Sequence, residues 1–277
     1  MVKMAVDLGL VQETLLIPLL GRALETRIGN GVLSDPKAVE IVDQLDYDFS
    51  KFKGQRSLRG SSIRTRMFDG LVSSFLEQHP TGTVVEIGAG LNTRYERLDN
   101  GRAHWLEMDL PDSMALRRKF FDDTDRRTMV SADVTKTDWF AELRQHPAPY
   151  CFVSEAVLIF LPNAKVDKVL ATLAQEFPGS MLVTDTTHTK MVDNQANHDS
   201  MNKLSQASWF QWRCDDPASL SYLGLHLERS MTLMDAPADV LAHMPFVMRF
   251  MATFLPRLVR WKLGRYKINH FTLMSPQ

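Results

Sequence analysis

Apolar positions recur at helical spacing in several stretches of the first eighty residues. The first stretch spans 11–28, where apolar residues three or four positions apart predict a helix with one buried face. We expect Arg22, Glu25 and Arg27 to lie off that face. The same spacing predicts two more helices, over 37–45 and 57–76. Residues 1–79 are therefore predicted to form an N-terminal helical cap region.

From residue 80 onward, short β-branched runs alternate with helical stretches. Short apolar runs bounded by glycine or proline are typical of buried parallel strands, and their alternation with helices predicts an α/β fold with helices on both faces of the sheet. The predicted strands lie at 83–87, 103–109, 128–132, 150–153, 180–185, 223–234 and 267–274, with helices at 112–121 and 163–177. We expect residues 80–277 to form this core, with insertions that cover a substrate around 186–222 and 236–265.

The first of these strands breaks into Gly88 and Gly90, in the run Thr-Val-Val-Glu-Ile-Gly-Ala-Gly. Glycine tolerates positive φ and lets a ligand approach the backbone, because it has no Cβ. Two glycines after a strand are a weak signal on their own, and the third glycine of a dinucleotide fingerprint is missing. The turn is consistent with a ligand site and does not identify the ligand.

The next predicted strand ends in Asp109, about twenty residues after the glycine turn, and Leu110 follows it. Doubly wound folds place a carboxylate at this distance, where it binds a ribose hydroxyl. Strand, glycine turn, helix, strand and carboxylate together predict half of a nucleoside-binding site. An NAD-dependent or nucleotide-sugar enzyme would use the same half-site, but the missing third glycine and the lack of an obvious Tyr-x-x-x-Lys pair count against it.

Composition narrows the class of protein. The chain has 277 residues, 44% of them hydrophobic and 23% charged, which is ordinary for a globular protein with a sizeable core. A net charge of -1 argues against a general nucleic-acid binder. Cys151 and Cys214 are too few for a disulfide framework or a zinc site. No run is long and apolar enough for a membrane span, and we expect a cytoplasmic protein.

Three segments occurring in order make the prediction more specific: Val-Val-Glu-Ile-Gly-Ala-Gly-Leu-Asn-Thr-Arg, Trp-Leu-Glu-Met-Asp-Leu-Pro and Ser-Glu-Ala-Val-Leu-Ile-Phe-Leu-Pro. Together they resemble the leucine carboxyl methyltransferase family, and most closely its tetracenomycin-type polyketide O-methyltransferase branch. Asn92 departs from the pattern, since the family usually has Asp there. The resemblance implies a class I methyltransferase fold, with a seven-stranded, mostly parallel sheet and an N-terminal helical cap.

The same resemblance implies S-adenosyl-L-methionine as cofactor and S-adenosyl-L-homocysteine as product. Arg64, or Arg66 as the fallback, matches the arginine that binds the carboxylate of the cofactor. Asp133 and Val134 match the adenine site, and Glu155 matches a glutamate that faces the cofactor. The full set of implied cofactor-binding residues is Arg64, Glu86, Gly88, Ala89, Gly90, Asp109, Leu110, Asp133, Val134, Glu155 and Ala156.

The expected reaction is methyl transfer to a carboxylate or hydroxyl of a small organic acid or phenol, with no metal, no nucleic acid and no membrane involved. The sequence identifies no general base; His188 and His198 are candidates by position alone, and Arg213 is a possible partner for a carboxylate of the acceptor. The aromatic residues around 209–212 belong either to the core or to a substrate wall. Two alternatives stay open, a carboxyl methyltransferase that acts on a protein C-terminus and a noncatalytic nucleoside-binding protein. We expect a monomer or a homodimer.

Overall fold

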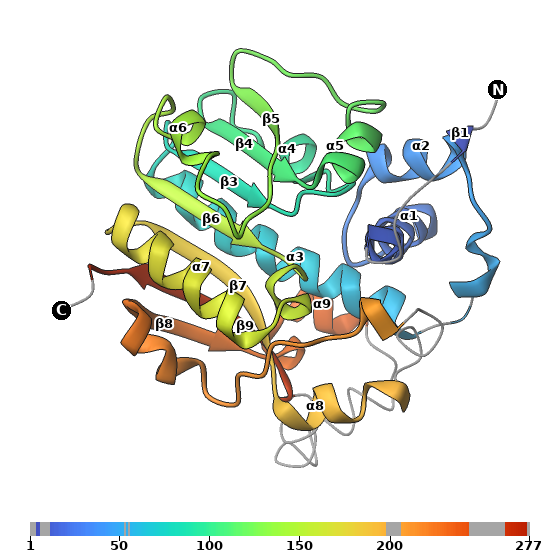
Figure 1. The fold of residues 1–277 in the computed structure, drawn as a ribbon. Helices are drawn as coiled ribbons and strands as arrows, with labels where there is room; N and C mark the ends of the chain where they lie inside the picture. The colour runs from blue at the N-terminus through green and yellow to red at the C-terminus, as the bar shows by residue number, and fades with distance from the viewer. Residues whose placement is uncertain are drawn as a thin grey trace.

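The computed structural model describes residues 4–5, 12–52, 54, 56–197, 206–243 and 264–275. A seven-stranded sheet lies at its centre, with the order β5-β4-β3-β6-β7-β9-β8 (Figure 1). Neighbouring strands from β5 to β7 pair in parallel, whereas β9 is antiparallel to both of its neighbours. The strands are β3 (Thr83–Ile87), β4 (His104–Asp109), β5 (Arg127–Ser131), β6 (Tyr150–Ser154), β7 (Met181–Thr187), β8 (Leu225–Met231) and β9 (Tyr266–Leu273). The predicted α/β fold class is confirmed.

Three helices precede the sheet: α1 (Leu16–Ile28), α2 (Pro36–Gln44) and α3 (Arg56–Gln78). A short parallel pair, β1 (Met4–Ala5) with β2 (Leu45–Asp46), lies beside α2. The other α-helices are α4 (Arg94–Leu98), α5 (Pro111–Arg117), α6 (Phe140–Leu143), α7 (Asn163–Glu176), α8 (Thr189–Asp193) and α9 (Ala238–Ala242). The 3-10 helices are η1 (Gln12–Leu15), η2 (Phe49–Phe52), η3 (Leu158–Phe160), η4 (Gln195–Asn197), η6 (Gln206–Ser208), η7 (Pro217–Leu223) and η8 (Leu233–Asp235).

Helices α7 and α3 cover opposite faces of the sheet (Figure 1). Successive side chains of a strand point to opposite faces, so each strand supplies both layers. On β6, Phe152 belongs to the apolar cluster that contains Leu170 of α7. Its neighbour Cys151 belongs to the cluster that contains Phe68 of α3. Cys151 is completely buried, and this burial raises the pKa of its thiol, as expected for an unreactive core cysteine.

The register of the parallel strands brings four chain positions to one edge of the sheet. Ile87 pairs with Met108 of β4 and with Ser154 of β6, and Ser154 pairs with Thr184 of β7. The residues that follow these pairs are Gly88, Asp109, Glu155 and Asp185. Open α/β sheets bind ligands at this carboxyl edge. The fold therefore gathers the glycine turn and three carboxylates in one place.

Of the three charged residues predicted to lie off the buried face of the first helix, Arg27 is exposed, whereas the other two are buried. Arg22 and Glu25 are only 2% and 4% exposed. Arg22 forms an ion pair with Asp35 at 2.8 Å, and Glu25 pairs with Arg59 at 2.9 Å, so both charges are compensated inside the protein. Periodicity alone does not distinguish a charge facing solvent from a charge facing a buried partner.

Two of the aromatic residues after β7 belong to the core. Phe210 and Trp212 are 8% and 1% exposed and pack in the cluster on the α7 side of the sheet. Most of the predicted insertion at 236–265 lies outside the described residues. Among the described helices, none combines the length and the apolar content that crossing a bilayer requires.

Candidate active site

The turn after β3 requires glycine at two positions. Gly88 and Gly90 have φ values of 66° and 47°, a region that side chains of L-residues disfavour. A Cβ on Gly88 would lie 2.4 Å from a methyl carbon of Val157. A Cβ on Gly90 would lie 3.3 Å from the Cβ of Leu15 and 3.8 Å from a carboxylate oxygen of Asp109. The turn is therefore enclosed by the N-terminal segment on one side and by the loop after β6 on the other.

Asp109 lies at the carboxyl end of β4 and faces this turn. Its Oδ2 accepts a hydrogen bond from the backbone N–H of Gly90 at 2.7 Å, and its Oδ1 accepts one from Leu110 at 2.7 Å. Burial raises the pKa of Asp109, although these hydrogen bonds oppose the shift. A carboxylate oxygen can accept more than one hydrogen bond, so Asp109 can also receive hydroxyl donors of a ligand beside the turn.

A buried arginine fixes the far side of the same turn. Arg117 donates to the backbone oxygens of Gly90 and Asn92, at 2.9 and 2.8 Å. The backbone N–H of Asn92 donates to Ala89 at 2.8 Å. The side chain of Asn92 lies 3.4 Å from Arg97, so the residue that departs from the family pattern is part of the turn's own hydrogen bonding.

Glu155, the first residue after β6, is held by two arginines. Its Oε1 accepts from Arg64 Nε at 2.9 Å and from Thr65 at 2.8 Å, while its Oε2 lies 2.5 Å from Arg94. Burial would raise the pKa of Glu155, but Arg64 and Arg94 lower it. Arg66, the fallback, is 38% exposed and lies 4.0 Å from Asp239. Of the two predicted arginines, the structure places Arg64 in the cluster at the sheet edge.

Glu86 is the last residue but one of β3 and is 3% exposed. Both of its carboxylate oxygens accept from Arg94 Nη1, at 2.6 and 2.8 Å. Burial raises the pKa of Glu86 against the opposing effect of Arg94. Glu86 thus binds Arg94, and Arg94 in turn binds Glu155. The predicted contact of Glu86 with a cofactor stays a prediction.

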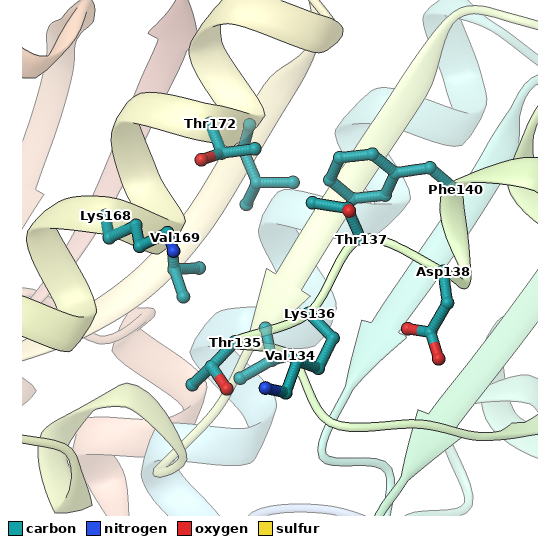
Figure 2. A pocket seen from close by; sticks show the side chains of 10 residues that line it. Val134, Thr135, Lys136, Thr137, Asp138, Phe140, Lys168, Val169 and Thr172 are labelled. Carbon is teal, nitrogen blue, oxygen red and sulfur yellow. The ribbon is translucent and has the colours of Figure 1, made fainter.

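The predicted adenine residues lie in the loop after β5. Asp133 Oδ1 accepts from the backbone N–H and the hydroxyl of Thr135, both at 2.8 Å, which stabilises the loop. Val134 lines a hollow of about 500 Å³ between this loop and α7. Figure 2 shows the loop residues, including Lys136, opposite Lys168 and other side chains of α7. The hollow borders the predicted adenine site from the α7 side.

The catalytic roles of His188, Arg213 and His198 stay predictions. His188 caps α8, and its Nδ1 accepts from the backbone N–H of Lys190 at 3.0 Å. Arg213 is 43% exposed and pairs with Asp193 at 2.8 Å. His198 lies outside the described residues. The contacts of His188 and Arg213 are thus those of surface residues.

Sequence reasoning missed a second cluster at the sheet edge. Asp185, near the end of β7, is completely buried, and its Oδ2 accepts from the backbone N–H of Ala156 at 2.8 Å and from the hydroxyl of Tyr266. Arg64 Nη1 lies 3.5 Å from the same hydroxyl. Ala156 has φ 55°, a strained value for an alanine. An Asp at the end of a predicted strand was the available signal, whereas Tyr266 gave none.

The family model described as leucine carboxyl methyltransferase matches residues 16–174. The chain belongs to the leucine carboxyl methyltransferase family. The match includes α1, α3, the glycine turn, Asp109 and Glu155, so the methyltransferase family model covers the carboxyl ends of β3 to β6 and stops before β7.

Two curated relatives extend the match beyond that segment. The chain is 29% identical to the tetracenomycin polyketide synthesis O-methyltransferase TcmP of Streptomyces glaucescens, over 82% of this chain and 84% of the relative. It is 24% identical to the S-adenosyl-L-methionine-dependent methyltransferase dpfgK of Gibberella zeae, over 76% of this chain and 77% of the relative. A DUF574 family protein from Streptomyces avermitilis has the same fold, with TM-score 0.60, 13% identity, and coverage of 91% and 96%. This methyltransferase therefore uses S-adenosyl-L-methionine.

The residues at the sheet edge fit that cofactor. A side chain on Gly90 would fill the space between Leu15 and Asp109, so glycine there permits the close approach that a ribose requires. Arg64 offers a guanidinium for a carboxylate, and Glu155 offers acceptors for an ammonium group. Nucleoside recognition and amino-acid recognition would thus occupy the two ends of one edge.

Proposed function

We propose that this methyltransferase transfers the methyl group to an oxygen, a carboxylate or a hydroxyl, of a small organic molecule. The observation that carries the proposal is the similarity to TcmP, a polyketide O-methyltransferase, over more than four fifths of both chains. The sulfonium of the bound cofactor makes its methyl group electrophilic. The protein therefore has to orient an acceptor oxygen in line with that methyl group and to exclude water.

In this proposal Asp109 binds the ribose, Arg64 binds the carboxylate of the methionine part, and Asp133 with Val134 contacts the adenine. Leu15 supports a small acceptor, because it lies beside Gly90 and closes the turn from the N-terminal side. An enclosed site suits a small molecule better than a protein tail. A carboxylate acceptor is already ionised at neutral pH and needs no base, whereas a phenol benefits from one.

The test incubates the purified chain with S-adenosyl-L-methionine and a panel of hydroxylated aromatic acids, aliphatic acids, phenols and peptides that end in leucine. Mass spectrometry then detects each methylated product. Mild base separates the two kinds of product, because it hydrolyses methyl esters and leaves methyl ethers intact. We expect methylation of one or more aromatic acids or phenols, and a matched Asp109→Ala variant should lose it. Methylation of the peptides alone would refute the proposal, and binding of the cofactor with no transfer would favour a noncatalytic role.

A further inference from the structure

A connected chain of buried charges crosses the protein from the N-terminal helices to the last strand. Each link is an ion pair or a charged hydrogen bond: Arg22–Asp35 at 2.8 Å, Asp35–Arg97 at 3.2 Å, Arg97–Asp69 at 2.8 Å, Asp69–Arg94 at 2.8 Å, Arg94–Glu86 at 2.6 Å, Arg94–Glu155 at 2.5 Å and Glu155–Arg64 at 2.9 Å. Arg64 then reaches Tyr266 at 3.5 Å, and Tyr266 donates to Asp185. We call this set the charge network.

The charge network is one positive charge short. Its carboxylates are Asp35, Asp69, Glu86, Glu155 and Asp185, and its guanidinium groups are Arg22, Arg64, Arg94 and Arg97. With all of them ionised, five negative charges face four positive ones in this part of the described structure. Inside a protein the dielectric screening is weak, so an uncompensated charge is costly. A proton or a cationic ligand would restore the balance.

Asp185 is the member that lacks a direct cationic partner in the described structure. Its Oδ1 is buried without a hydrogen bond there, and its Oδ2 receives the neutral donors Ala156 N–H and Tyr266 O–H. The charged and titratable groups that face it are Arg64 from α3, Glu155 after β6 and Tyr266 on β9. Burial raises the pKa of Asp185 to about 6, against the opposing effect of Arg64. Asp185 therefore takes up a proton more readily than an ordinary aspartate.

A short path connects Asp185 to the glycine turn. Asp185 holds the backbone N–H of Ala156, whose strained φ of 55° sets the direction of the following residue. That residue, Val157, packs directly over Gly88. Protonation or deprotonation of Asp185 therefore changes the charge beside the loop that borders the predicted cofactor site.

We propose that Asp185 distinguishes the methyl donor from its product by charge: the sulfonium of S-adenosyl-L-methionine favours the ionised form of Asp185, and the neutral thioether of S-adenosyl-L-homocysteine does not. This inference rests on the proposed cofactor site. The amino-acid part of both ligands is zwitterionic, so they differ by the sulfonium charge alone. Asp185 would take a proton from solvent once that charge has been lost with the methyl group, which makes it a specificity-determining residue rather than a base for the acceptor.

The experiment is isothermal titration of the whole chain at pH 6 in two buffers with different ionisation enthalpies, which reports the protons released on binding. The ligands are S-adenosyl-L-methionine, S-adenosyl-L-homocysteine and sinefungin, in which an ammonium group replaces the methylsulfonium. Asp185 is half protonated at about pH 6. A ligand that weakens its proton binding tenfold, which lowers its pKa by about one unit, would release about 0.4 proton at that pH. We expect this release for both cationic ligands and none for S-adenosyl-L-homocysteine.

The pH dependence gives a second readout with a fixed sign. Ionised Asp185 favours the cationic ligand, so the preference for S-adenosyl-L-methionine over S-adenosyl-L-homocysteine should increase by about fivefold between pH 5 and pH 7 and then level off. Asp185→Asn keeps the shape and an acceptor oxygen, and it should abolish both the proton release and this pH dependence. Asp43→Asn, which removes a carboxylate that is 64% exposed, should change neither.

Equal proton release for all three ligands in the wild-type chain would overturn the inference, and so would release that persists in Asp185→Asn. The wild-type comparison needs no variant, so a folding defect in Asp185→Asn does not leave the question open. The titration also needs no knowledge of the molecule that accepts the methyl group. A chain that shows the expected proton release but methylates no small molecule would refute the proposed function and leave the role of Asp185 standing.

Discussion

Replacing Arg94 by methionine tests the buried ion pairs most directly. Arg94 is 1% exposed and donates charged hydrogen bonds to Asp69, Glu86 and Glu155. Burial opposes its charge, but the neighbouring carboxylates together raise its pKa well above the ordinary value. Methionine keeps much of the volume and removes the charge, so the change in stability reports the ion pairs more than the packing.

The expected loss follows from the partners that remain. Asp69 keeps Arg97 at 2.8 Å, and Glu155 keeps Arg64 at 2.9 Å. Glu86 loses the partner that held both of its oxygens. The cost should therefore be that of one buried carboxylate left unpaired, about 3–5 kcal/mol of the free energy of unfolding. A typical domain has about 5–15 kcal/mol in total, so this is a large fraction.

The assay is urea unfolding followed by circular dichroism at pH 5 and pH 7. In the variant, the folded protein would keep a proton on Glu86 that the unfolded chain releases, because the pKa of Glu86 would be raised further above its unfolded value. The free energy of unfolding then falls as pH rises from the pKa of Glu86 in the unfolded chain to its higher pKa in the folded protein, by up to about 1.4 kcal/mol per pH unit. The loss should be smaller at pH 5 than at pH 7.

Two further variants provide the controls. Arg94→Met combined with Glu86→Gln removes the uncompensated charge and should recover most of the loss at pH 7. Arg27→Met disrupts a surface pair in which the two side chains are 41% and 64% exposed, and should cost less than about 1 kcal/mol. A loss below about 1 kcal/mol for Arg94→Met, or no recovery in the double variant, would refute this account of the network.

Other predictions concern the cofactor site. Arg64→Ala and Asp109→Ala should each weaken S-adenosyl-L-methionine binding by about 1.5–3 kcal/mol, because each removes a charged hydrogen bond. Adenosine separates the two roles in titration calorimetry: Asp109→Ala should weaken its binding, Arg64→Ala should not, and equal weakening by both would contradict the assignment. Gly90→Val should destabilise the fold by about 1–3 kcal/mol, since its φ is 47°, and should abolish cofactor binding because the new side chain lies between Leu15 and Asp109. Micromolar binding of S-adenosyl-L-homocysteine by folded Gly90→Val would contradict that expectation.

Much of the sheet could be predicted from the sequence because its strands are continuous apolar runs. The run before Gly88, for example, was predicted at 83–87, and β3 spans Thr83–Ile87. The end of β4 at Asp109 also agrees with its predicted position. Parallel strands buried on both faces contain few polar positions that could blur this pattern. Helix 112–121 was predicted too long, since α5 ends at Arg117 and a turn follows.

The charge network could not be predicted, because it depends on which residues meet in three dimensions. Arg22 lies 13 residues from Asp35 in the chain, and Tyr266 lies 81 residues from Asp185. From the sequence alone, each of these residues would be interpreted as a surface charge or as an ordinary strand residue. Glu155 and Arg64 were found because they match a family motif, and their ion pair at 2.9 Å needed the structure.

Leu15 has a kinetic consequence. It lies in η1 at the start of α1, and its Cβ is 3.3 Å from the point where a side chain on Gly90 would begin. A molecule seated against the glycine turn would lie beside that segment, and we expect its release to require a movement of the segment. The residence time of the product would be set by the opening of residues 12–15. Substitutions there would change the turnover rate while the methyl-transfer step itself kept its speed.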